Sequence, residues 1–82
     1  MTGTGPTKTA PTRLALVGAG LIGREHAGLI LAHPNTELVA ICDPSPQARD
    51  FAASLDVAYY SEWDLMLDQA KPDGVIIALP NQ

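Results

Sequence analysis

Residues 14–23 read Leu-Ala-Leu-Val-Gly-Ala-Gly-Leu-Ile-Gly, a short apolar run that leads into three spaced glycines. A G-x-G-x-x-G pattern that follows a strand-like run and opens a helical pattern is typical of a dinucleotide-binding turn. The first glycine allows the tight turn, the second lets backbone N–H groups approach a pyrophosphate, and the third lets helix and strand pack closely. The unpaired N–H groups and the positive dipole at a helix N-terminus suit an anion. We therefore expect a pyrophosphate to bind at Gly18, Ala19, Gly20, Leu21, Ile22 and Gly23.

An acidic residue supports this interpretation of the glycines. Asp43 lies twenty residues after Gly23, at the end of the apolar run 38–42. A carboxylate at this place in the pattern accepts hydrogen bonds from the adenosine ribose of a dinucleotide. The alternative is purely structural: the glycines make a close turn, and Asp43 caps the helix that follows. The matching order and spacing of these features favour the binding site.

The residues around Asp43 favour NAD over NADP as the cofactor. The carboxylate pairs with a free ribose 2′-hydroxyl but repels a 2′-phosphate, which usually has an arginine nearby. Residues 44–46 provide no cation, and Arg49 stands about one helical turn further on.

Size and composition limit the class of protein. The chain has 82 residues, 46% of them apolar, which suits one small domain or part of a larger one. Its net charge of −4, with five dispersed basic residues, argues against a nucleic-acid partner. No apolar run reaches the roughly 18 residues that cross a bilayer. Three glycines interrupt the run after Arg13, which argues against a secretory signal.

The single cysteine, Cys42, has no partner for a disulfide, and no histidine is near it in the chain. We expect it to be a small buried apolar residue, and we expect the protein to be cytoplasmic. Nothing in the pattern suggests a metal site.

The chain divides into a tail and an alternation of strands and helices. Residues 1–12 are rich in Thr, Gly and Pro and are expected to be a disordered tail, and residues 13–82 to be the first part of a dinucleotide-binding domain. Apolar runs predict strands at residues 13–17, 37–42, 57–60 and 75–79. Helices are expected at residues 21–32, at residues 46–55 and after Ser61. Ser45 and Ser61 are their predicted N-caps, Ser61 with Asp64 in a capping box.

Each helix is expected to bury an apolar face against the sheet. The predicted contact residues are Ile22, Ala27, Leu29 and Ile30 in the first helix, Ala48, Phe51, Ala52 and Leu55 in the second, and Trp63, Leu65, Met66 and Leu67 in the third. His26 falls on the first of these faces and is expected to be packed or half-buried there, while Arg24 and Glu25 face outward.

The element order β-α-β-α-β-α-β predicts an α/β fold. Right-handed crossovers give an incomplete Rossmann, or doubly wound, parallel sheet with strand order 3-2-1-4 and helices on both faces. Ligands bind such sheets at the carboxyl ends of the strands where the strand order reverses, here between the first and fourth strands. The glycine turn, Asp43 and the segment Leu79, Pro80 and Asn81 all lie at this edge, where we expect the cofactor crevice.

Three segments resemble the glucose–fructose oxidoreductase / inositol dehydrogenase (Gfo/Idh/MocA) family. They are Val17-Gly18-Ala19-Gly20-Leu21-Ile22-Gly23-Arg24-Glu25-His26, Glu37-Leu38-Val39-Ala40-Ile41-Cys42-Asp43-Pro44 and Asp73-Gly74-Val75-Ile76-Ile77-Ala78-Leu79-Pro80-Asn81. Tyr59-Tyr60 before a short helix is also usual in that family. The glycine motif is common to many dehydrogenases, but its Gly-Arg-x-His continuation together with a strand that ends in Pro-Asn is more specific.

The resemblance implies an NAD(P)-dependent oxidoreductase that transfers hydride between the nicotinamide and a sugar, polyol or related hydroxy compound. Family members add a larger second domain that completes the substrate site and forms a homo-oligomer. In the family, the segment that matches Leu79, Pro80 and Asn81 lies along the cofactor.

The resemblance also implies that the catalytic lysine of the family, in a Glu-Lys-Pro segment after the next strand, lies beyond Gln82. Lys71-Pro72 is similar in sequence but precedes the fourth strand, which places Lys71 on the order of 20 Å from the crevice. We therefore expect no catalytic residue within this chain, which is then the front part of an enzyme.

The alternatives are an NAD-binding regulatory module without redox activity and an inactive truncated gene product. Asp43 and the glycine spacing weigh against a flavin enzyme and against a methyltransferase. The fourth strand would be a bare apolar edge, so the isolated chain is expected to be marginally stable and to bind cofactor weakly.

Overall fold

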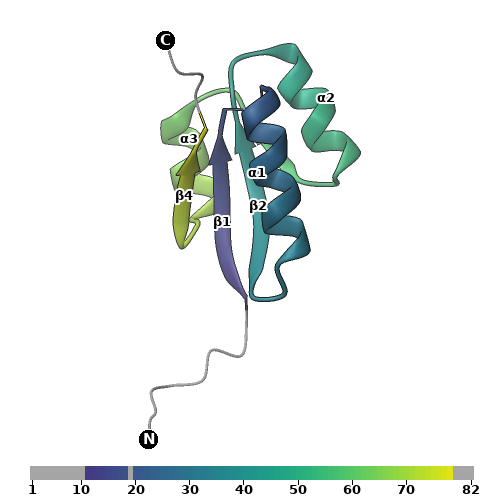
Figure 1. Cartoon of the computed structure of the whole chain (residues 1–82). Coiled ribbons are helices and arrows are strands. Elements are labelled where there is room, and N and C mark those ends of the chain that lie inside the picture. The colour runs from purple at the N-terminus through teal and green to yellow at the C-terminus, as the bar shows by residue number, and fades with distance from the viewer. Residues whose placement is uncertain (1–10, 19, 79–82) are drawn as a thin grey trace, which may run out of the picture.

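The computed structural model describes residues 11–18 and 20–78, which form one alternating series of strands and helices (Figure 1). The predicted order of elements is confirmed, and the bounds differ from the expected ones by at most two residues. The predicted tail falls mostly on residues 1–10, outside the described residues. The elements are β1 (Thr12–Val17), α1 (Leu21–Ala32), β2 (Thr36–Cys42), α2 (Pro46–Ser54), β3 (Ala58–Tyr60), α3 (Trp63–Ala70) and β4 (Gly74–Ile77).

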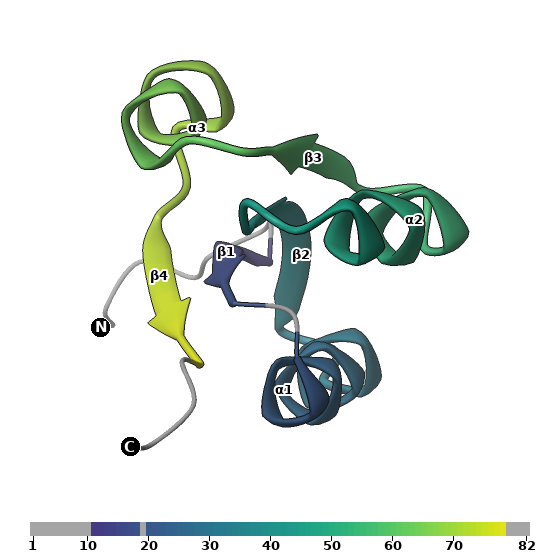
Figure 2. The ribbon, with the colours of Figure 1, turned by 90° about the horizontal axis from the view of Figure 1, so that it is seen from above.

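The four strands form a parallel sheet in the predicted order β3-β2-β1-β4. Seen along the strands, α1 and α2 cover one face of the sheet and α3 covers the other (Figure 2). This arrangement follows from right-handed crossovers, because the chain moves outward from β1 to β3 and then returns across the sheet to β4. All four carboxyl ends therefore lie at one edge.

The sheet is buried on both sides, as its continuous apolar strands predict. On the side of α1 and α2, Leu16 and Ile41 are completely buried and contact the small helix residues Ala27, Ala48 and Ala52. Burying a side chain such as Leu or Ile contributes about 1.5–3 kcal/mol. The side of α3 has a smaller core, built from the following residues: Ala15, Ala40, Cys42, Met66 and Ala70.

Strand β2 contains one more residue than its partner. Leu14 pairs with Leu38 and Ala15 pairs with Ala40, so Val39 has no partner in β1. Side chains normally alternate between the two faces of a strand, but Val39 and Ala40 both pack on the side of α3. Val39 is therefore a β-bulge that reverses the alternation, and it returns Ile41 to the side of α1 and α2.

Helix α2 buries the face that was predicted, but the faces predicted for α1 and α3 are wrong in part. Leu29 is 68% exposed, because α1 touches the sheet through a narrow line of positions that includes Ala27 and Ile30. In α3, Met66 and Ala70 make the contact with the sheet. Three residues of the predicted α3 face lie outside that line and are exposed: Trp63 (40%), Leu65 (46%) and Leu67 (37%). His26 is half-buried and Arg24 and Glu25 are exposed, as predicted, and the side chain of Ile22 lies outside the described residues.

The predicted cap of α2 is confirmed and that of α3 is wrong. The Ser45 hydroxyl accepts a hydrogen bond from the Ala48 N–H at 3.2 Å, and Pro46 occupies the first turn. Helix α3 instead begins after Glu62, whose extended backbone forms the N-cap, and no side-chain hydrogen bond caps this helix. The capping box of Ser61 and Asp64 is therefore absent, because the helix starts one residue later than that motif requires.

Arg13 hydrogen-bonds to the carbonyl groups at the C-terminal end of α3. Its guanidinium donates to the carbonyl oxygens of Ala70 and Lys71, each at 2.8 Å. Its backbone N–H donates to the Asp73 carboxylate at 2.8 Å, and the Asp73 N–H donates to the Arg13 carbonyl at 2.7 Å. These bonds join the start of β1 to the start of β4, at the edge opposite to the carboxyl ends. Lys71, with φ of 47°, is the left-handed C-cap of α3 there.

Strand β4 pairs with β1 alone and forms one edge of the described sheet, where Ile77 is 60% exposed.

Within the described residues, no helix has the length and apolar character needed to cross a membrane. The same part of the chain contains no group of three or more His, Cys, Asp or Glu side chains that could hold a metal ion.

Candidate dinucleotide-binding site

The turn after β1 has the geometry that its glycines predict. Gly18 has φ of 96°, a left-handed conformation that strains any residue with a side chain. A Cβ atom at Gly23 would lie 2.2 Å from the Gly18 carbonyl oxygen, far inside any allowed contact. The first turn of α1 therefore packs directly on the turn backbone. A Cβ atom at Gly20 would meet no described atom within 4 Å, so this position faces open space.

The N-terminus of α1 has the features of an anion site. Gly20 is its N-cap, and in the described part of the chain no side chain caps the first turn and no acidic residue stands in it. The first N–H groups of a helix have no partners inside the helix, so they remain able to bind an anion. The backbone of Leu21 and Ile22 belongs to this first turn, while their side chains and all of Ala19 lie outside the described residues.

Asp43 lies beside this turn. The Gly18 N–H donates to the carbonyl oxygen of Cys42, the residue before Asp43, at 2.9 Å. On the other side, the Asp43 N–H donates to the Tyr60 carbonyl at 3.1 Å. The structure thus brings Gly18, Gly23 and Asp43 together at the carboxyl edge, although they come from two separate segments. Among the described residues, no atom lies within 4 Å of a Cβ position at Gly20, which leaves room for close approach of a ligand to the backbone.

Asp43 is not the cap of α2, which was the structural alternative for this residue. Its carboxylate oxygen Oδ1 accepts a hydrogen bond from the Ser45 N–H at 2.9 Å, which shapes the turn before the helix. Ser45 then caps the helix itself. An ionised carboxylate accepts several hydrogen bonds at once, so this bond is compatible with a ribose hydroxyl on the same group.

Tyr59 is a contributor that the sequence analysis missed. Its hydroxyl donates to the Asp43 carbonyl oxygen at 2.7 Å and lies 3.5 Å from the Ser45 carbonyl oxygen. In the sequence, the Tyr59–Tyr60 pair contributes only to the family resemblance. The available signal was alternation: neighbouring strand residues point to opposite faces, so one of the two tyrosines had to face α2.

Cys42 is 4% exposed, as predicted for a small buried residue. Burial in the protein, and secondly the negative charge of Asp43, raise the pKa of its thiol above the ordinary value of 9.0. A thiol with a raised pKa is a poor nucleophile, which agrees with a packing role.

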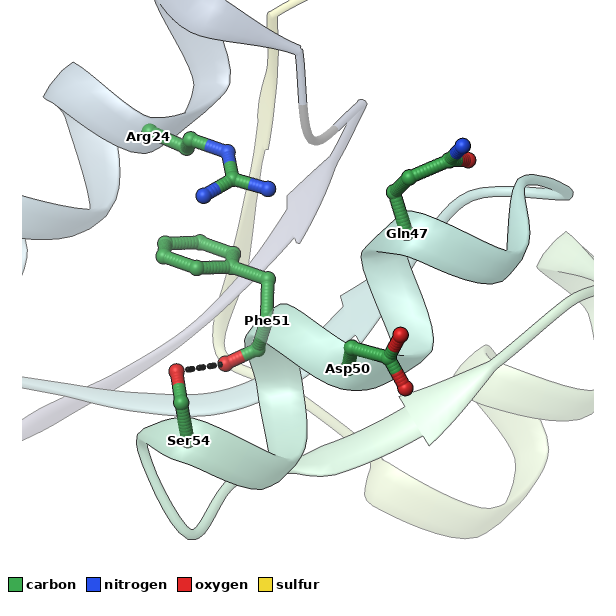
Figure 3. Close-up of a pocket in the computed structure, with 5 residues that line it drawn as sticks. All are labelled: Arg24, Gln47, Asp50, Phe51 and Ser54. Atoms are coloured by element: carbon green, nitrogen blue, oxygen red, sulfur yellow. Dashed lines mark hydrogen bonds between the residues drawn. The ribbon is translucent and has the colours of Figure 1, made fainter.

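A pocket of about 320 Å³ lies between α1 and α2 (Figure 3). The Arg24 guanidinium stands over the ring of Phe51, 4.5 Å from its centroid, and joins the two helices by a cation–π contact. The pocket is lined by Arg24, Gln47, Asp50, Phe51 and Ser54. None of these five residues belongs to the predicted site, although Arg24 directly follows Gly23 in α1 and its N–H donates to the Gly20 carbonyl at 2.9 Å.

The last predicted segment, Leu79, Pro80 and Asn81, lies outside the described residues. The residue before it is placed: the Ala78 N–H donates to the Val17 carbonyl at 2.8 Å. The chain therefore leaves β4 beside the end of β1, at the edge that carries the glycine turn.

A parallel sheet with a glycine turn at the switch point, and an acid at the end of the neighbouring strand, defines the class of dinucleotide-binding Rossmann domains. The chain belongs to the Gfo/Idh/MocA family, described as an oxidoreductase family with an NAD-binding Rossmann fold, whose model matches residues 12–82. The predicted family and fold class are thereby confirmed.

Individual relatives agree with this assignment. The rhizopine catabolism protein MocA of Rhizobium meliloti is 33% identical over 69 residues, which are 84% of this chain and 22% of the relative. The WlbA dehydrogenase from Bordetella pertussis, solved with NADH and UDP-GlcNAcA, is 35% identical with a TM-score of 0.82, over 92% of this chain and 22% of that one. The scyllo-inositol dehydrogenase from Lactobacillus casei, solved with NAD(H) and scyllo-inositol, is 27% identical with a TM-score of 0.77, over 85% of this chain and 22% of that one.

These matches establish an NAD-binding Rossmann domain of an oxidoreductase family, and its relatives include dehydrogenases solved with UDP-GlcNAcA and with scyllo-inositol. They give no support to a regulatory module or an inactive product. The chain spans less than a quarter of the length of these relatives.

Proposed function

We propose that this chain is the NAD-binding portion of an oxidoreductase that transfers hydride between nicotinamide and a sugar, polyol or related hydroxy compound. The observation that carries the proposal is the bond from the Gly18 N–H to the Cys42 carbonyl, which holds the glycine turn beside Asp43. The substrate class is supported by the relatives solved with UDP-GlcNAcA and with scyllo-inositol.

In this proposal the described residues bind and orient the cofactor. The N-terminus of α1 holds the pyrophosphate, with Gly20 allowing close approach of the phosphate oxygens to the backbone. Asp43 accepts hydrogen bonds from the ribose hydroxyls. When bound, the nicotinamide supplies the hydride chemistry. Leu79, Pro80 and Asn81 are proposed to continue the site along the cofactor.

We place the catalytic residues outside this chain. Lys71 supports this view, because it caps α3 at the edge opposite to the carboxyl ends of the strands. The proposed complete protein has a second domain that completes the substrate site, is a cytoplasmic homo-oligomer and binds no nucleic acid. The net charge of −4 fits the last of these proposals.

The cofactor is proposed to be NAD rather than NADP. A 2′-phosphate would approach the carboxylate of Asp43, and two negative charges at close range repel each other. Arg24 is the cation on the neighbouring helix, and its guanidinium stands over Phe51.

Calorimetric titration of the protein as its gene encodes it, with NAD and with NADP, tests this proposal. We expect NAD to bind at least about tenfold more tightly than NADP, because the Asp43 carboxylate repels a 2′-phosphate. A tenfold ratio of affinities corresponds to about 1.4 kcal/mol. The variant Asp43→Asn keeps an acceptor for the Ser45 N–H and removes the charge, so it should reduce the ratio. Absence of binding by both cofactors would refute the function, and tighter binding of NADP would refute the cofactor preference.

Hydride transfer is tested by nicotinamide absorbance. With NAD and a panel of polyols and sugar nucleotides, we expect the reduced cofactor to accumulate with at least one of them. Cofactor binding without any change in nicotinamide absorbance across the panel would favour the alternative hypothesis of an NAD-binding regulatory module without redox activity.

A further inference from the structure

Tyr59 joins β3 to the loop that carries Asp43. The Tyr59 ring packs against the core beneath α1 and α2, and this core fixes the ring. From there the hydroxyl reaches over the end of β2 and donates to the Asp43 carbonyl oxygen at 2.7 Å. This distance is typical of a well-formed O–H···O hydrogen bond.

The hydroxyl completes a set of bonds around one residue. The Asp43 N–H is bonded to the Tyr60 carbonyl, and its carbonyl oxygen is bonded to the Tyr59 hydroxyl. The carboxylate oxygen Oδ1 accepts from the Ser45 N–H. Main chain and side chain of Asp43 are thus fixed from β3 on one side and from the start of α2 on the other.

We propose that Tyr59 is a positioning residue for the carboxylate of Asp43, and that it raises affinity for ligands with a vicinal diol on the adenosine ribose. This inference rests on the proposed function. A binding group that is already held in its bound position loses less freedom when the ligand arrives, so the affinity is higher. Without the hydroxyl, the Asp43 carbonyl would lose its hydrogen bond to β3 and only the bond from the Asp43 N–H to the Tyr60 carbonyl would remain, so the carboxylate would sample more positions.

The neighbouring tyrosine provides a matched control. Tyr60 lies in the same strand and is similarly half-buried, but its ring packs against the core on the side of α3. Its contact with Asp43 uses the backbone carbonyl, which substitution by phenylalanine leaves in place. Tyr59→Phe and Tyr60→Phe therefore each remove one oxygen atom from the same strand on opposite faces.

The experiment compares two ligands on three proteins. NAD and its analogue lacking the 2′- and 3′-hydroxyls of the adenosine ribose are titrated into the wild-type protein as its gene encodes it, into Tyr59→Phe and into Tyr60→Phe. We expect Tyr59→Phe to weaken NAD binding about fivefold to tenfold, as for the loss of one hydrogen bond, and to change binding of the analogue less than about twofold. Tyr60→Phe should change neither.

The difference between the two ligands separates positioning from general stability. Equal weakening for NAD and for the analogue would mean that Tyr59 only stabilises the fold, and would overturn the inference. Unchanged NAD binding by Tyr59→Phe would overturn it too, while leaving the proposed function intact. If the wild-type protein binds no NAD, the proposed function fails and the inference fails with it.

A measurement on the wild-type protein makes the test independent of variant folding. With tyrosine rings labelled for NMR, the Tyr59 resonances should shift on addition of NAD and shift clearly less on addition of the analogue. Identical shifts with the two ligands would overturn the inference.

Discussion

Alanine at Gly23 should be among the most damaging small substitutions in this chain. The new Cβ atom would lie 2.2 Å from the Gly18 carbonyl oxygen and 2.9 Å from its carbon, and both are backbone atoms that cannot rotate away. An ordinary contact needs at least about 3.4 Å, so α1 would have to move away from the turn by roughly 1 Å. That movement would loosen Ala27 and Ile30, which are 1% and 7% exposed in the core.

Overpacking of this kind costs about 1–3 kcal/mol, and a clash with backbone falls at the upper end. For a domain of this size a loss of about 3 kcal/mol lowers the melting temperature by about 12 °C or more. Urea and thermal unfolding followed by far-UV circular dichroism measure the effect. Because the turn also forms the proposed pyrophosphate site, the same variant should lose NAD binding.

Gly28 gives a matched control in the same helix. It is exposed, and a Cβ atom there would meet no described atom within 4 Å. Glycine is less favourable than alanine inside a helix by about 1 kcal/mol, so Gly28→Ala should stabilise the protein by that amount. The same chemical change is therefore expected to have opposite signs at two positions of α1. If Gly23→Ala melts within a degree or so of the wild type, the close packing of α1 on the turn is refuted.

Three further predictions concern stability and reactivity. Arg13→Met should lower the free energy of unfolding by about 2 kcal/mol, measured in urea, because the carbonyls of Ala70 and Lys71 lose a charged donor; an unchanged midpoint would contradict the role of Arg13 at the end of α3. Ser45→Ala should cost about 1 kcal/mol in the same assay through loss of the α2 cap, and Ser45→Gly clearly less. Cys42 has a raised pKa, so the folded state disfavours its thiolate, and its contribution to stability should persist below pH 9.0 and be lost as the pH rises above that value. Unfolding measured from neutral to alkaline pH should show this loss in the wild type and a smaller one in Cys42→Ala, and equal losses would contradict the assignment.

Most of the fold was predictable because apolar strands and turn residues alternate clearly along the chain. The errors came from contacts that periodicity does not encode. Leu29 lies in the same apolar helix as Ala27 and Ile30, but it is exposed while they are buried. The number of apolar helix residues that the sheet covers depends on how closely the helix approaches the sheet. Trp63 and Leu65 were misplaced for the same reason: α3 meets the sheet through Met66 and Ala70.

The placement of the glycine turn beside Asp43 was predictable because the spacing of the glycines and the acid is a local pattern. The support of the acid was not. Tyr59 and Asp43 are 16 positions apart, and their bond joins a side chain to a main-chain carbonyl, for which no sequence motif exists. Such a bond becomes visible only when β2 and β3 are placed side by side. The predictions for Ala19 and for residues 79–81 stay predictions, because these residues lie outside the described part of the chain.

The bulge at Val39 has a consequence for how this strand can change in length. With strictly alternating side chains, the apolar residues before and after the bulge could not both face α1 and α2, yet Leu38 and Ile41 do. Deletion of Val39 alone would remove the bulge and leave Leu38 and Ile41 two positions apart, so a regularly paired β2 would still bury both of them beneath α1 and α2. A relative with a regularly paired strand must therefore differ by an odd number of residues between these two apolar positions if both are to face the same two helices.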